Sequence, residues 1–73
     1  MPRVMSENQM LLLRYLLEVG VSKSNAVGIS IDLWEEEATL EMLAYCSENP
    51  NASQAQLLKA SSEISSKFKR QRA

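Results

Sequence analysis

Residues 10–19 constrain the fold more than any other part of the chain, because only Arg14 and Glu18 among them are polar. A helix that packs one face against a core normally exposes a polar arc of about half its circumference. Arg14 and Glu18 are one helical turn apart, so they share a single narrow strip of the surface. We therefore expect this segment to be buried on nearly all sides, by the rest of the chain or by another molecule.

The length of the chain limits what can cover that segment. Seventy-three residues correspond to one domain, residues 1–73. A domain of this size buries only about 60% of its unfolded surface, so its stability is marginal without help. Cys46 is the single cysteine and there is no histidine, which excludes an internal disulfide and a zinc site of standard spacing. Association is then the favoured source of added stability, and we expect a homodimer or a protein partner, although a well-packed domain of four helices can also be stable alone.

The same composition argues against catalysis. Without histidine, no side chain has an unperturbed pKa near neutrality. Gly20 and Gly28 are the only glycines, too few for a loop that cradles phosphate. Cys46 lies on an apolar stripe near Glu48 and reads as a packed thiol. We predict no enzymatic activity and no catalytic, cofactor-binding or metal-binding residues.

Capping signals divide the chain into helices. Ser6 with Gln9 three residues later forms a capping box, and Gly20 fits the left-handed position after a helix, which predicts a helix over 6–19. Ser53 with Gln56 repeats the capping pattern and starts another helix at about residue 54.

The middle of the chain is less clear. Residues 25–33 fit both a helical stripe and the alternation of a strand. Because a lone strand would have no pairing partner, a short helix over 23–31 is favoured, with Gly28 at a close approach to the first helix. Asp32 and Glu35 then repeat a cap-and-acid spacing, which predicts a helix over 33–48.

These elements define the fold class. The sequence predicts an all-α protein, a compact bundle of four short helices with the first helix at its centre. The ends, at about 1–5 and 69–73, are expected to be loose.

Charge is distributed unevenly although the net charge is only −1. Residues 32–48 carry six acidic side chains and no base, whereas residues 59–72 carry five basic side chains and one acid. This polarity indicates either a match within the molecule or a head-to-tail contact between molecules.

The N-terminal segment lacks the pattern of a signal peptide, because polar residues 6–9 interrupt the position of an apolar core. No stretch reaches the roughly 18 apolar residues of a membrane-spanning helix. A single free cysteine is consistent with a reducing compartment. We expect a cytoplasmic protein without a membrane partner.

Residues 16–22, followed by Asn25-Ala26 and an acidic helix, resemble ubiquitin-associated domains. Those domains are three-helix bundles that bind ubiquitin through a turn with a glycine and an aromatic residue. Here the turn reads Val19-Gly20-Val21 and lacks the aromatic residue. The resemblance covers about half the chain and implies the helix layout more than the ligand.

Residues 42–60, with Asn49-Pro50 leading into Ala52-Ser53, resemble the opening of bacterial helix-turn-helix regulators. The resemblance implies a positioning helix, a turn at residues 61–62 and a reading helix over 64–72. Among the residues that it would place against DNA are four basic side chains, Lys67, Lys69, Arg70 and Arg72. Acidic residues in the helix predicted over 33–48 would repel the DNA phosphates.

The function that these observations favour is association with protein. We expect a small non-enzymatic interaction module that associates with itself or binds another protein. DNA binding through residues 64–72 is the alternative. Trp34 fits either a core or an interface position. The predicted interface residues are Leu11, Leu12, Tyr15, Leu16 and Trp34.

Overall fold

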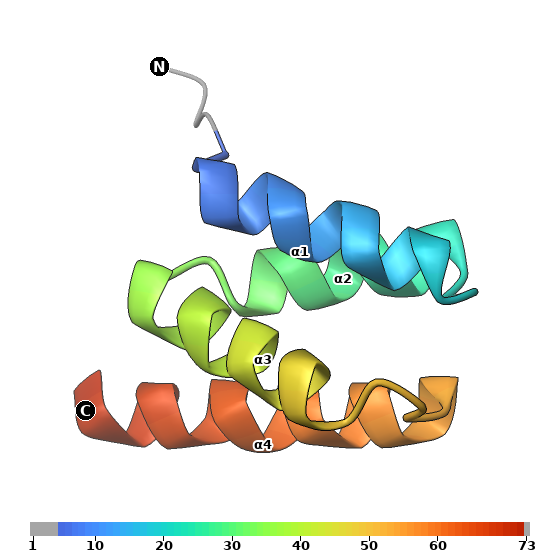
Figure 1. Ribbon diagram of the computed structural model, residues 1–73. Coiled ribbons are helices and arrows are strands. Elements are labelled where there is room, and N and C mark those ends of the chain that lie inside the picture. The colour runs from blue at the N-terminus through green and yellow to red at the C-terminus, as the bar shows by residue number, and fades with distance from the viewer. Residues whose placement is uncertain (1–4, 73) are drawn as a thin grey trace.

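The computed structural model describes the backbone of residues 5–72 and side-chain surroundings as far as residue 70. Within that range the chain forms four helices and no strand, so the predicted all-α fold is confirmed (Figure 1). Residues 25–32 belong to the second helix, which resolves the helix-or-strand ambiguity. The helices are α1 (Glu7–Glu18), α2 (Lys23–Asp32), α3 (Glu36–Glu48) and α4 (Gln54–Arg72).

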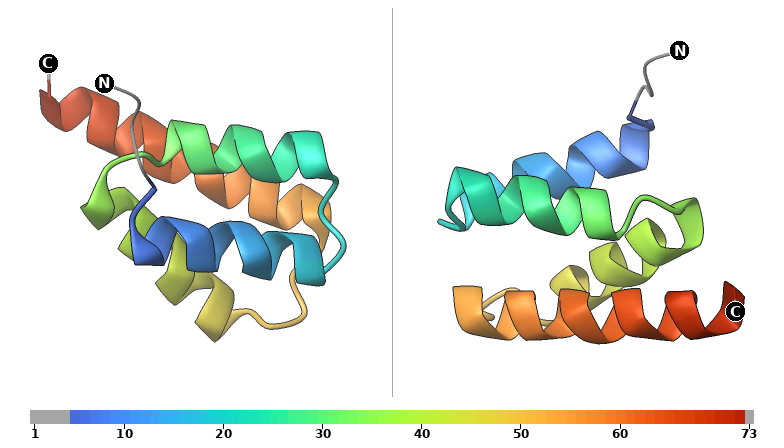
Figure 2. Two further views of the ribbon diagram at one scale, coloured as in Figure 1. Left: turned by 90° about the horizontal axis from the view of Figure 1, so that it is seen from above. Right: turned by 180° about the vertical axis from the view of Figure 1, so that it is seen from behind.

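The four helices form a ring in which the extensive contacts join α1 to α2, α2 to α4, α4 to α3 and α3 to α1. Consecutive helices run antiparallel, while α1 and α3 begin at the same end of the bundle (Figure 1). Figure 2 shows from two further sides that α1 and α4 occupy opposite corners of this ring. The first helix therefore has two main neighbours, as every other helix does.

The expectation that residues 10–19 are buried on nearly all sides is wrong. Leu12 and Leu16 face the core, but Met10, Leu11 and Leu17 are 46%, 54% and 43% exposed. The reason is geometric. In a ring of four helices, two neighbours and the core between them cover one side of α1, and its outer side faces solvent.

The core is one cluster to which all four helices and two connections contribute. Val21 in the first connection and Leu33 in the second are buried alongside the helical residues, so both connections are held against the core. Its members are Leu12, Leu16, Val21, Ala26, Ile29, Leu33, Ala38, Met42, Cys46, Leu57 and Ala60.

The α1–α2 turn follows the sequence signals. Gly20 has a φ of +96°, the left-handed region that favours glycine. Ser22 caps α2 by accepting from the Asn25 backbone N–H. Gly28 does not mark a close approach to α1, because a Cβ built there meets no atom within 4 Å. That expectation is therefore wrong.

The start of α3 also differs from the prediction. Asp32 is the last residue of α2 rather than a cap, and α3 begins at Glu36 after an N-cap, Glu35, without a side-chain capping bond. Leu33 is fully buried, and its backbone N–H bonds to the Ile29 carbonyl, which ties it to the end of α2. The buried Thr39 hydroxyl then donates to the Leu33 carbonyl at 2.6 Å.

A polar cluster fixes the start of α1 to the α2–α3 connection. The predicted capping box is present, with the Ser6 N–H donating to Gln9 Oε1 and the Gln9 N–H donating to Ser6 Oγ. The Gln9 side-chain amide also donates to the Trp34 carbonyl. Glu36 accepts from Ser6 Oγ at 2.9 Å and from Asn8 Nδ2 at 2.5 Å. Tertiary contacts therefore anchor this helix end.

Helix α4 begins at the predicted capping box, Ser53 with Gln56, and continues without a break to Arg72. The turn at residues 61–62 that the helix-turn-helix resemblance implied is absent. Ser61 is buried and donates its hydroxyl to the Leu58 carbonyl one turn earlier, so it is accommodated inside the helix. Residues 69–72, which the sequence placed in a loose end, are helical, and residues 1–4 and 73 of the predicted loose ends lie outside the described residues.

Candidate interaction surface

Exposed large apolar side chains gather on one part of the molecule. All of those among the described residues lie on α1, its C-cap residue, α2 or α3. Helix α4 is the longest helix, yet each of its large apolar side chains is at least partly buried. The exposed set consists of Met10, Leu11, Leu17, Val19, Val27, Ile31 and Leu40.

One stripe borders the seam between α1 and α2. Met10, the half-buried Leu13 and Leu17 follow each other at three- and four-residue spacing and share one flank of α1. Asn8, which bonds to α3 through Glu36, lies on the opposite flank, so this stripe faces the α2 side. We call this stripe, together with Val27 and Ile31 of α2, the α1–α2 apolar surface.

The counterpart consists of Val27 and Ile31, one turn apart on α2. Asn25 lies on the other flank of α2, where its side chain bonds to Gln54 of α4. Val27 and Ile31 therefore point away from α4 and toward the α1 side. The α1–α2 apolar surface is thus contributed by two adjacent antiparallel helices.

A second group borders the seam between α1 and α3. Leu11 and the half-buried Tyr15 lie one turn apart on the flank of α1 that carries Asn8. Leu40 and the half-buried Leu43 follow Glu36 at helical spacing, and Glu36 faces α1. Helix α1 is therefore flanked by exposed apolar groups on both sides.

The predicted interface residues have different surroundings. Leu11 is exposed, and Tyr15 and Trp34 are half-buried, so these three offer surface to a partner. Leu12 and Leu16 are core residues, 1% and 0% exposed, and cannot meet a partner in the folded chain. Sequence reasoning missed several exposed residues. The sequence signal that could have identified them was their position, either beside Arg14 and Glu18 on α1 or at helical spacing on α2 and α3. They are Met10, Leu17, Val27, Ile31 and Leu40.

The basic residues of α4 are partly engaged within the molecule. Lys67 Nζ lies 2.5 Å from Glu41 Oε1 on α3 and 5.7 Å from the Phe68 ring centroid. Lys69 and Arg70 are exposed, and the Arg72 side chain lies outside the described residues. One ion pair, between Glu41 of the acidic region and Lys67 of the basic region, therefore joins α3 to α4 within one molecule.

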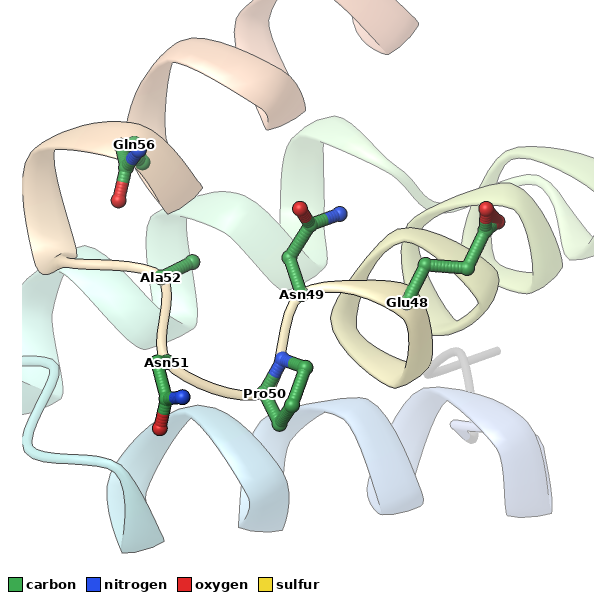
Figure 3. A pocket seen from close by; sticks show the side chains of 6 residues that line it. All are labelled: Glu48, Asn49, Pro50, Asn51, Ala52 and Gln56. Carbon is green, nitrogen blue, oxygen red and sulfur yellow. The ribbon is translucent and has the colours of Figure 1, made fainter.

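The hollows of the surface are small. One of about 330 Å³ is formed by the α3–α4 loop, where Asn49 and Asn51 point in opposite directions (Figure 3). Its only ionisable lining residue is Glu48. A second hollow, of about 220 Å³, lies between α2 and α4 beside Gly28 and Asp32. Neither of these two brings together an acid, a base and a nucleophile. A third hollow, of about 240 Å³, has Tyr45, Lys59 and Glu63 among its lining residues, of which Lys59 and Glu63 are exposed on α4.

Cys46 lies in the core, as its place on an apolar stripe predicted. Burial raises the pKa of its thiol above the ordinary value of 9.0, because the charged thiolate loses solvation. The thiol is therefore held in its protonated, weakly nucleophilic form at neutral pH.

Two kinds of feature are absent from the described residues, 5–72. No three or more side chains of the metal-binding types gather into a group that could hold an ion. None of the described helices combines the length and apolar character needed to cross a membrane.

No protein-family model, curated protein or solved structure matches this chain. Neither resemblance noted in the sequence therefore gains support from a related protein.

Proposed function

We propose that this protein is a small helical interaction module that associates with protein through the outer side of α1 and the adjoining flanks of α2 and α3. The observation that carries the proposal is the one-sided distribution of exposed apolar residues. Exposed apolar residues that gather on one part of a small monomer, rather than being scattered singly, are typical of contact sites. A chain of this size also gains more from association than a large one, because its own core is small.

The experiment compares the purified protein with Ile31→Gln on α2 and Leu11→Gln on α1. Ala55→Gln, at an exposed position of α4, is the matched control. Self-association is measured by light scattering across a concentration series, and partner capture is quantified from a cell extract with the tagged protein. Each apolar substitution should weaken association by about 1 kcal/mol or roughly fivefold, since each side chain is about half exposed before binding.

The control should bind like the wild type. The proposal fails if the wild type stays monomeric and also captures no protein more strongly than the Ile31→Gln and Leu11→Gln variants do.

A further inference from the structure

Charged side chains run along the outward face of α1. At about 100° per residue, Glu7, Arg14 and Glu18 fall within roughly 40° of one another around the helix. They lie opposite the buried Leu12 and Leu16, and all three are exposed. None of the three has an ion-pair partner among the described residues. Helix α1 lies at an edge of the molecule, so no other helix of the described chain covers this face (Figure 1).

Two apolar side chains separate the first two of these charges. Seven residues make almost two complete turns, so Glu7 and Arg14 lie nearly in line, about 10.5 Å apart along the helix. Met10 and Leu11 lie between them in height, one on each side of that line, and both are about half exposed. The face therefore presents a negative charge, an apolar pair and a positive charge, in that order.

We infer that this face binds a second copy of the same chain, with the two α1 helices antiparallel about a two-fold axis level with the midpoint between Met10 and Leu11. This inference rests on the proposed function and names its partner. The axis sets Glu7 of each copy level with Arg14 of the other, which makes two ion pairs. It also brings Met10 against Met10 and Leu11 against Leu11, because a two-fold axis sets the flank beside α2 against its own equivalent.

The order of the charges selects this arrangement over the alternatives. A parallel pairing in register would place Glu7 beside Glu7 and Arg14 beside Arg14, and these contacts repel. An antiparallel pairing of Arg14 with Glu18 would overlap only residues 14–18, whereas the pairing with Glu7 overlaps residues 7–14 and includes the apolar pair. Two turns of overlap make a small contact, so we expect a weak dimer.

Charge reversal at position 7 tests the contact. Glu7→Arg replaces both ion pairs with repulsion between arginines, so the dimer dissociation constant should rise about tenfold or more. Sedimentation velocity over a concentration series measures the dissociation constant. Low ionic strength is used because it screens exposed ion pairs least.

The matched control is Glu18→Arg. It makes the same change of charge on the same face of the same helix. In the inferred dimer, position 18 is about 11 Å from the axis and extends past the start of the opposite α1. The dissociation constant of this variant should therefore stay within about twofold of the wild-type value.

A double variant, Glu7→Arg with Arg14→Glu, exchanges the two charges and keeps the net charge of the wild type. Its ion pairs form again with the charges reversed, so its dissociation constant should return to within about threefold of the wild-type value. Glu7 lies in the first turn of α1, where the helix dipole favours an acid, so Glu7→Arg also opposes the dipole. Because the double variant carries the same change at position 7, recovered dimerisation in it cannot be an effect of folding.

Four outcomes overturn the inference: a wild type that stays monomeric to about 1 mM, a Glu7→Arg variant that dimerises like the wild type, a Glu18→Arg variant that loses as much affinity as Glu7→Arg, or a double variant that dimerises no better than Glu7→Arg. A monomeric wild type that still captures another protein through Leu11 and Ile31 would leave the proposed function intact and remove only the second copy as its partner.

Discussion

Leu11 and Leu12 are chemically identical neighbours, yet one is more than half exposed and the other is buried. One step along a helix turns the side chain by about 100°, which is enough to move it from the core to the solvent side of α1. The same rotation separates the buried Leu16 from the exposed Leu17. Residue type therefore does not decide which leucine serves the core and which serves a partner. Position on the helix decides it.

The buried thiol of Cys46 gives a pH prediction. Its pKa is raised by burial in the folded state, so the folded protein binds a proton that the unfolded chain releases as the pH rises past about 9. This contribution to stability is fully present below that pH and is lost as the pH rises toward the folded pKa, by up to about 1.4 kcal/mol per pH unit.

Denaturant unfolding of the wild type and Cys46→Ala between pH 7 and pH 10.5 measures the effect. The difference between their free energies of unfolding should shrink as the pH rises. Equal pH dependence in the two proteins would show that the thiol titrates freely in the fold.

At the scale of the helices, local sequence signals determine some helix ends and tertiary contacts determine others. Capping boxes correctly placed the starts of α1 and α4, because Ser6 with Gln9 and Ser53 with Gln56 act within four residues. The start of α3 was misplaced, since burial of Leu33 decides where α2 ends and sequence spacing does not report it. The exposure of one side of α1 was also missed. The number of helices that pack against α1 depends on the arrangement of the whole ring, which the periodicity of α1 alone does not report.

The two capping boxes provide a matched pair of mutations. Gln9 is buried and also bonds to the Trp34 carbonyl, whereas Gln56 is exposed and serves only its own cap. Gln9→Ala should cost about 2–3 kcal/mol, because it leaves a partly buried carbonyl without its donor, and Gln56→Ala about 1 kcal/mol or less. Chemical denaturation compares them. Equal losses would show that the contact with the α2–α3 connection adds nothing to the cap.

At the scale of the molecule, one small core stabilises the whole chain. Eleven residues form that core, and each helix contributes to it, so no helix has an independent source of stability. A domain of this length has only a few kcal/mol to lose. The exposed parts of the apolar side chains around α1 lie outside this core and contribute little to the stability of the isolated molecule.

Because one small core stabilises the chain, we expect different results from truncating a buried and an exposed leucine of α1. Leu16→Ala should cost about 2–5 kcal/mol and leave much of the protein unfolded at ambient temperature. Leu11→Ala should change the stability of the dilute protein by no more than about 0.5 kcal/mol. Circular dichroism melts measure both. Comparable losses in the two variants would mean that the outer side of α1 belongs to the core.

The opposite corners occupied by α1 and α4 decide where a fluorophore or fusion protein can be attached. A reporter joined before Ser6 would sit beside the end of α1 and the polar cluster that anchors it. One joined after α4 would leave from the far corner of the ring, where the chain exposes no large apolar side chain among its described residues (Figure 2). Carboxy-terminal tagging is therefore the arrangement that leaves the association surface free for surface immobilisation, energy transfer and two-hybrid measurements.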